Sequence, residues 1–396
     1  MALFRRKRGG DNGNGDSNTK KEKGSWRRPA NTAFKQQRLK AWQPILTPRT
    51  VLPTLFIIGL VFAPIGALLI WGSGLVSEMS FDYTDCELQQ PASSSSQLTF
   101  VEMPSSKYSY KLRASESSAS HTPPQYAFLD QSSDLSVNVT QRKQCFIQFD
   151  VPINLDPTVL LYYKLTNFYQ NHRRYVKSLN QNQLRGDFVS PSTLSGGDCK
   201  PLDVTSDGKA IYPCGLIANS LFNDSFSSLT LTTDNTTIYN FSSTGIAWPG
   251  EAKKYATKPG YSLDQIVPPP NWSLLFPNNY TDSSPPPDLK TNEHFQNWMR
   301  TAGLPTFTKL FGRNDNDLLP QGRYQITVDL NYPVRSFKGT KSIVISTVSW
   351  MGGKNPFLGY NQAFGEAEEI GRHDSPFVQS MIQFVLCVFI GLLLHL

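Results

Sequence analysis

The chain has 396 residues and a net charge of +7 that is distributed unevenly along the sequence. Residues 1–49 contain thirteen Lys and Arg against three acids, a net charge of +10, so the remaining residues sum to −3. An apolar run without a charged residue follows this basic tail at 51–76. We do not expect a basic segment beside a membrane anchor to bind nucleic acid, and that class of function is set aside.

The basic tail, residues 1–49, is expected to lie in the cytosol, because positively charged segments beside a membrane helix stay on the cytoplasmic side. Its last part, residues 31–48, interleaves aromatic and basic side chains, as in a segment that lies against anionic lipid headgroups or a partner. The candidate contact residues are Phe34, Lys35, Arg38 and Trp42. A solvated, disordered arm that only sets the orientation is the alternative.

The first apolar run predicts a transmembrane helix at residues 50–76. Its 26 uncharged residues exceed the roughly 20 that span a bilayer. The run is too long, and starts too far from the N-terminus, for a cleaved signal peptide. Pro64 lies inside it and should kink the helix, which is tolerated best where a neighbouring helix packs against the kink. Pro64 is therefore a further candidate contact.

A second apolar run, residues 377–396, is about long enough to span the membrane but contains Gln379, Ser380 and Gln383. We expect it to form a second transmembrane helix, which places both termini in the cytosol. If it does not span, the chain is a single-pass type II membrane protein.

The segment between the two runs, residues 77–376, carries six N-glycosylation sequons and four of the five cysteines. This is typical of a glycosylated, disulfide-bonded lumenal domain. The sequons are Asn138, Asn223, Asn235, Asn240, Asn271 and Asn279. The cysteines Cys86, Cys145, Cys199 and Cys214 allow three pairings, and proximity in the sequence favours Cys86 with Cys145 and Cys199 with Cys214. They include no CxxC pair and have no His cluster beside them, so we expect no metal site.

The lumenal segment is rich in strand signals. Strands are predicted at 145–151, 158–163, 229–233, 324–330 and 342–350. The clearest is 324–330, where apolar and polar residues alternate as in a sheet with one buried face. Helical spacing is found at 165–179 and 295–302. The predicted fold is mainly β: an antiparallel β-sandwich with a few helices, flanked by two transmembrane helices.

Signals for catalysis are weak, and no cofactor is expected. The chain lacks a phosphate-binding loop, a dinucleotide-binding loop, a serine-hydrolase elbow and a zinc-protease motif. Glu293 and His294 are adjacent, but neighbours on a helix do not face each other. Asp150 and Asp156 could act as a pair in glycoside hydrolysis, although Asp156 precedes Pro157 and fits a turn. No catalytic residue is therefore assigned.

Longer blocks of the sequence carry a resemblance to a known family. The blocks are NTAFKQQRLKAWQPILTP at 31–48, LTNFYQNHRRYVKS at 165–178, CGLIANSLFNDSF at 214–226, IAWPG at 246–250, FQNWMRTAGLPTFTKLFGR at 295–313 and GTKSIVISTVSWMGGKNPFLG at 339–359. They are similar to the cell division cycle protein 50 family, also called the ligand-effect modulator family. Members of this family are the accessory β subunits of type IV P-type ATPases, the phospholipid flippases.

The resemblance implies a non-catalytic subunit that forms a heterodimer with the ATPase. Family members accompany the ATPase out of the endoplasmic reticulum and are needed for its movement of aminophospholipids to the cytosolic leaflet. The implied partners are the catalytic subunit and membrane phospholipids. The implied location is the endoplasmic reticulum, the Golgi and endosomes, or the plasma membrane.

The C-terminus departs from the family pattern. After Gly359 the family runs almost directly into its second membrane helix and then a basic cytosolic tail. Here residues 360–376 are polar, and no tail follows the last apolar run. The predicted span at 377–396 is therefore atypical for the family.

Two other classes of protein would share the sequons, disulfides and strands. One is a membrane-anchored lumenal glycosidase or carbohydrate-binding protein, which requires converging carboxylates or an aromatic platform in a cleft. The other is an adhesion ectodomain on a single membrane anchor.

Overall fold

The computed structural model describes residues 31–40, 47–234 and 236–357, which fall into two units, 1–57 and 58–396. The described part of the first unit contains a turn at 33–37 and the start of helix α1 (Pro48–Gly74). Helix α1 is long and apolar enough to cross a membrane, and it is the one such helix among the described residues. It continues through Pro64 as a single helix. The run at 377–396 lies outside the described residues.

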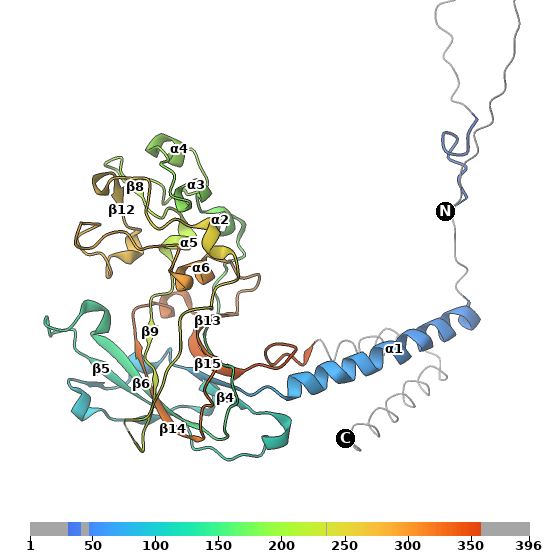
Figure 1. Cartoon of the computed structure of the whole chain (residues 1–396), viewed down its shortest axis with the longest axis horizontal. Helices are drawn as coiled ribbons and strands as arrows, with labels where there is room; N and C mark the ends of the chain where they lie inside the picture. Colours follow the sequence, from blue (N-terminus) through green and yellow to red (C-terminus); the bar gives the residue numbers. More distant parts are fainter. Residues whose placement is uncertain (1–30, 41–46, 235, 358–396) are drawn as a thin grey trace, which may run out of the picture. The chain divides into compact units, whose positions relative to one another are not determined.

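The second unit is mainly β, and its strands form two large antiparallel sheets (Figure 1). The strands are β1 (Glu78–Asp82), β2 (Pro91–Ala92), β3 (Val101–Glu102), β4 (Tyr108–Lys111), β5 (Gln125–Asp130), β6 (Lys143–Val151), β7 (Val159–Leu165), β8 (Ala210–Ile211), β9 (Ser225–Phe226), β10 (Leu229–Leu231), β11 (Ile238–Tyr239), β12 (Ile266–Val267), β13 (Phe307–Asn314), β14 (Gly322–Asp329) and β15 (Lys341–Thr347). The helices after α1 are α2 (Arg173–Lys177), α3 (Gln181–Leu184), α4 (Pro191–Ser195), α5 (Leu216–Asn219) and α6 (Glu293–Met299).

One sheet has five strands in the order β13-β7-β15-β1-β4, and all its pairs are antiparallel. The other follows the order β11-β10-β14-β6-β5-β2, with β3 paired to β5 and β9 to β14. Only the short pairs β2–β5 and β8–β12 are parallel among the described strands. The prediction of a mainly β, antiparallel fold is confirmed. The five strands predicted from the sequence correspond to β6, β7, β10, β14 and β15.

Both sheets contribute side chains to one hydrophobic cluster, because their strands alternate buried and partly exposed residues. Phe81 of β1 stacks on Phe149 of β6, with ring centroids 4.5 Å apart. Ile326 of β14 lies opposite Ile147 of β6 and is fully buried. The disulfide between Cys86 and Cys145 lies in the same cluster. It ties the turn after β1 to the other sheet.

A second hydrophobic cluster lies among the helices. Figure 1 shows α2 to α6 gathered with β8 and β12 beyond one end of the large sheets. Trp298 of α6 is fully buried there and donates an indole N–H bond to the carbonyl of Ile217 at 2.8 Å. The Cys199–Cys214 disulfide belongs to this cluster. One face of β7 serves both clusters, because Leu161 lies in the first and Tyr163 in the second.

The helix predicted at 165–179 is wrong over most of its length. Strand β7 continues to Leu165, and only α2 at Arg173–Lys177 is helical. Asn167 has a positive φ of 55°, which breaks a helix. The buried side chain of Gln170 then accepts a hydrogen bond from the backbone of Ala302 at 2.8 Å. Tertiary contacts therefore decide this segment against its helical spacing.

The ends of two other predicted elements also differ from the structure. Strand β15 ends at Thr347 rather than at residue 350, because Ser349 and Gly352 form a tight turn with two backbone hydrogen bonds of 2.9 Å. Helix α6 begins at Glu293, capped by Asn292, whose side chain accepts a bond from the backbone of Phe295.

A buried ion pair joins the two hydrophobic clusters. Lys341, the first residue of β15, lies 2.8 Å from Asp224, and the two side chains are 2% and 0% exposed. The other oxygen of Asp224 accepts bonds of 2.6 Å from the backbone of Asn331 and Tyr332. The Tyr83 hydroxyl also donates to Asp224. Tyr83 belongs to the first cluster and Tyr332 to the second, so the pair fixes one cluster against the other.

We expect Lys341→Met to lower the free energy of unfolding by about 3–5 kcal/mol, because it leaves the carboxylate of Asp224 buried without its cation. The double variant Lys341→Met with Asp224→Asn should lose less than the two single variants added together. Denaturant unfolding of the full-length protein in detergent measures this coupling. Lys107→Met is the matched control, since Lys107 pairs with Asp82 and Asp85 near the surface, where such pairs contribute about 0–1 kcal/mol. Strictly additive losses at Lys341 and Asp224 would contradict the assigned role.

Candidate functional site

Three segments meet at the C-terminal end of α1, and we name them the collar: residues 71–77, 111–116 and 347–357. Trp350 lies directly against Gly72, so that a Cβ atom on Gly72 would come within 3.0 Å of the indole ring. Lys354 donates from Nζ to the carbonyls of Val76 and Leu112, both at 2.9 Å. The collar thereby connects α1 to β4 and β15, the two strands that neighbour β1 in its sheet.

The chain that leaves α1 is held on both sides before it enters β1. The backbone N–H of Ser77 donates to the hydroxyl of Thr347 at 3.0 Å, and the N–H of Thr347 donates to the carbonyl of Ser77 at 2.9 Å. The hydroxyl of Ser77 accepts from the backbone of Arg113 at 3.0 Å. These three hydrogen bonds tie the link between α1 and β1 to β15 on one side and to the segment after β4 on the other.

The collar combines buried or paired charges with exposed apolar side chains. Arg113 pairs with Glu116 at 2.8 Å and with Asp156 at 3.1 Å, and the hydrogen bond that it donates to Glu116 is the main reason that the pKa of Arg113 is raised. Burial lowers the pKa of Lys354. The exposed apolar residues of the collar are Trp71, Leu75, Val348, Trp350 and Phe357. Such a surface is suited to contact with a partner or with lipid.

The candidate contacts predicted near the N-terminus lie in the first unit, except Pro64. Phe34 is 76% exposed, and Lys35 and Arg38 are exposed as well. Arg38 is hydrogen-bonded to the side chain of Asn31. Trp42 lies outside the described residues. Pro64 is exposed within α1.

The sequons differ in how open they are. Four of the asparagines are exposed: Asn138, Asn240, Asn271 and Asn279. Asn223 is half-buried, and Asp224, the middle residue of its sequon, is the buried partner of Lys341. Asn235 lies outside the described residues.

The residues considered for catalysis have structural partners. Glu293 accepts bonds of 3.0 and 2.9 Å from the backbone of Gly245 and Ala247, and so fixes the loop that presents Trp248. His294 packs on Phe311 with ring centroids 4.5 Å apart, and burial lowers its pKa. The hydrogen-bond partners of Asp150 are Thr122 and Arg323, and Asp156 pairs with Arg113. None of the four converges with another carboxylate on an open cleft.

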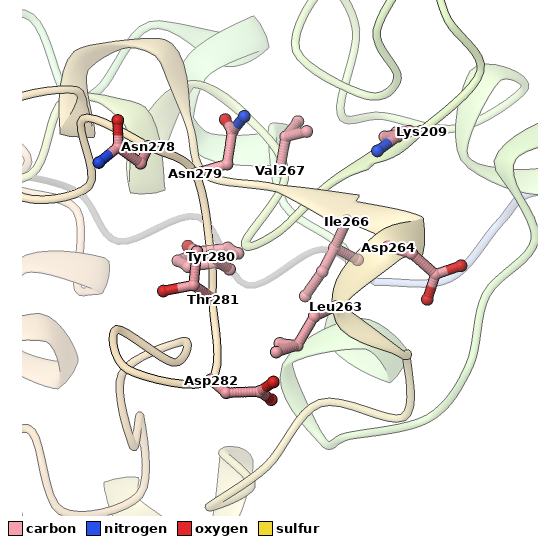
Figure 2. Close-up of a pocket in the computed structure, with 10 residues that line it drawn as sticks. All are labelled: Lys209, Leu263, Asp264, Ile266, Val267, Asn278, Asn279, Tyr280, Thr281 and Asp282. Carbon is pink, nitrogen blue, oxygen red and sulfur yellow. The ribbon is translucent and has the colours of Figure 1, made fainter.

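A cavity of about 420 Å³ lies in the helical part of the molecule, between residues 263–267 and 278–282 (Figure 2). Two carboxylates line it, Asp264 and Asp282. The pKa of Asp264 is lowered by the hydroxyl of Ser262, whereas a glycosidase acid needs a raised pKa. Tyr280 also lines it, but this ring is buried and its hydroxyl donates to the carbonyl of Tyr212 at 2.7 Å. Neither Asp264 nor the buried ring of Tyr280 therefore supports a glycosidase site in this cavity.

A lysine that the sequence did not reveal lies buried at the end of α6. Lys309 of β13 is 7% exposed and donates from Nζ to the carbonyl of Asn297 at 2.7 Å and to the carbonyl of Arg300. A cation at this position satisfies carbonyls that a helix end leaves unpaired. Burial, together with the nearby charge of Arg300, lowers the pKa of Lys309 to about 8. Within the described residues, no group of three or more His, Cys, Asp or Glu could hold a metal ion.

Residues 69–363 match the model of the LEM3 (ligand-effect modulator 3) family / CDC50 family. The chain belongs to this family. The match covers both sheets, both hydrophobic clusters and all of the collar. It confirms the resemblance seen in the sequence blocks.

Named relatives cover most of the chain. Phospholipid-transporting ATPase accessory subunit CDC50 of Chaetomium thermophilum is 40% identical over 358 residues, which are 89% of this chain and 85% of the relative. Phospholipid-transporting ATPase accessory subunit CRF1 of Saccharomyces cerevisiae is 44% identical over 333 residues, with 84% and 80% covered. Cell cycle control protein 50A of Bos taurus is 41% identical over 347 residues, with 84% and 83% covered.

We expect Gly72→Ala to displace Trp350, because the added methyl group would lie 3.0 Å from the indole ring. The turn at Ser349–Gly352 should then open more often. Hydrogen exchange of the two backbone amides in this turn is expected to become several-fold faster. Gly74→Ala is the matched control, since its Cβ would meet only the Cβ of Ala114 at 3.7 Å, an ordinary contact. Equal exchange rates in the two variants would show that the Gly72–Trp350 contact does not stabilise this turn.

The buried Lys309 predicts a pH dependence of stability. Its pKa is about 8 in the folded protein and 10.5 ordinarily, so between these values the unfolded chain binds more protons and stability rises with pH. The Lys309→Met variant has no titrating group at this position, so it lacks this increase of stability with pH. The stability difference in favour of the wild type should therefore increase between pH 8 and 10, by at most about 1.4 kcal/mol per pH unit. Denaturant unfolding of both proteins at each pH tests it, and a difference that is constant with pH would refute it.

Proposed function

We propose that this protein is a non-catalytic accessory subunit of a phospholipid-transporting P-type ATPase. It forms a heterodimer with the catalytic subunit, accompanies it out of the endoplasmic reticulum and is needed for aminophospholipid movement to the cytosolic leaflet. The observation that carries the proposal is the identity of 40–44% over 84–89% of the chain to proteins named as accessory subunits of such ATPases. The partner hydrolyses ATP and provides the transport path.

The contacts that the chain offers to this partner support the proposal. The collar joins α1 to the sheet that follows it, so a partner that binds α1 would also be linked to the sheet. If the conformations of the partner contact α1 and the sheet differently, binding shifts the populations of those conformations. The exposed Phe34, Lys35 and Arg38, together with Trp42 and Pro64, are proposed as further contacts with the partner or with phospholipid headgroups.

The topology belongs to the same proposal. Residues 1–49 are cytosolic, 50–76 span the membrane, 77–376 form the lumenal domain and 377–396 span a second time. The two sheets are proposed to pack as a sandwich, which the shared hydrophobic cluster and the contact between Phe81 and Phe149 support. The sequon asparagines are proposed to carry glycans, with the endoplasmic reticulum, the Golgi and endosomes, or the plasma membrane as locations.

The test is affinity purification of the tagged full-length chain, co-expressed with a type IV P-type ATPase. We expect mass spectrometry to recover the ATPase and a glycosidase to shift the band of the tagged chain. Uptake of a fluorescent phosphatidylserine by the cells should depend on the chain.

A matched variant separates the accessory subunit from the carbohydrate-active alternative. Asp264→Ala with Asp282→Ala removes both carboxylates of the cavity and touches no collar residue. An accessory subunit should retain ATPase recovery and lipid uptake with these changes. A glycosylated, folded chain that recovers no ATPase would defeat the proposal.

A further inference from the structure

We propose that the exposed aromatic and aliphatic side chains of the collar form a binding surface for the headgroup layer of the bilayer, with Trp71 and Trp350 at its centre. The proposal rests on the proposed membrane topology and goes beyond it. It assigns lipid contact to the folded domain, through a residue that is distant from α1 in the sequence. The occupant is the phospholipid interface itself.

The depth of Trp71 follows from the length of α1. Arg49 and Trp71 belong to the same helix and are 22 residues apart, which at 1.5 Å per residue is about 33 Å. The hydrocarbon core of a bilayer is about 30 Å thick. If Arg49 lies among the headgroups on one side, Trp71 lies among those on the other. Trp is the residue that prefers this layer, because its ring is apolar and its N–H is polar.

Trp350 lies at the same depth because it touches the next residue of the helix. Its indole ring packs on the position of Gly72, with ring atoms 3.0–3.3 Å from where a Cβ would be. Lys354 fixes the segment through the carbonyls of Val76 and Leu112. The ring is still 67% exposed, and Trp71 is 60% exposed. The two rings therefore present an open surface at the level of the headgroups.

The surface is continuous with the apolar side of α1. Val61, Ile65 and Leu68 are exposed and follow one another at helical spacing. Trp71 and Leu75 continue this stripe, since they follow Leu68 by three and seven residues. Val348 and Phe357 extend the collar away from the helix, and both are exposed. A stripe that begins in the hydrocarbon core and ends in two Trp rings matches the polarity profile of a bilayer, which favours lipid as the occupant.

The test uses the full-length chain in nanodiscs with phosphatidylcholine whose acyl chains are brominated near the headgroup. Bromine quenches Trp fluorescence only at close range. We expect Trp350→Phe to lose part of the quenchable emission and Trp71→Phe with Trp350→Phe to lose more. Trp248→Phe is the matched control, because Trp248 is 63% exposed but lies outside the collar, and its removal should leave the quenchable emission unchanged.

The first measurement bears on the proposal separately from the accessory-subunit function, because the nanodiscs then contain the isolated chain without the ATPase. Quenchable emission that is unchanged in Trp350→Phe overturns the lipid surface, even if the ATPase is still recovered in affinity purification. Quenching in the isolated chain that disappears when the chain is reconstituted with the ATPase would assign the surface to the protein partner instead. Quenching that persists in the complex supports lipid as the occupant. Phe keeps an aromatic ring at each position, and a thermal melt of each variant verifies that it is folded.

Discussion

Strand β15 is the constraint on which the rest of the second unit depends. It is paired along its length with β7 on one side and β1 on the other, so its position in the sheet is fixed. At its first residue, Lys341 forms the buried pair with Asp224. At its last residue, Thr347 holds the chain that leaves α1. With about 3.4 Å per residue, the seven residues set a spacing of about 20 Å between these two points. Strand β15 therefore connects the Lys341–Asp224 ion pair, which lies between the two hydrophobic clusters, to the C-terminal end of α1.

The polar interactions inside the domain are those of a scaffold. Asp224 and Glu293 bind backbone groups of distant segments, and Lys309 binds carbonyls at the end of the neighbouring helix α6. A buried polar group whose hydrogen bonds are all made within the protein fixes one arrangement of the chain. A catalytic group, in contrast, needs a polar atom that can still bind the substrate. This use of charge fits a protein that presents surfaces to a partner. Several of the exposed apolar residues lie where contacts with a partner or with lipid would be made, at the collar and along α1.

The sequence predicted the elements that depend on local pattern. The alternation at 324–330 is strand β14, and the uncharged run at 51–76 is most of α1, because period and composition are properties of neighbouring residues. The helix predicted at 165–179 is wrong because Gln170 and Asn167 bind segments more than a hundred residues away in the chain. The contact between Gly72 and Trp350 could not be predicted for the same reason: 277 residues separate them in the chain. Likewise, Lys309 lies in a strand whose sequence gives no sign that this one lysine turns inward.

The buried pair also has a consequence for the order of events during synthesis. Asp224 and Lys341 are 117 residues apart, and a ribosome adds about 5–20 residues per second. The partner of Asp224 therefore emerges on the order of ten seconds after it. During that interval the segment around Asn223 has no cation to draw it into the interior. Under the proposed lumenal topology, Asn223, which is half-buried in the folded protein, is accessible to a glycosylating enzyme until β15 joins the sheet.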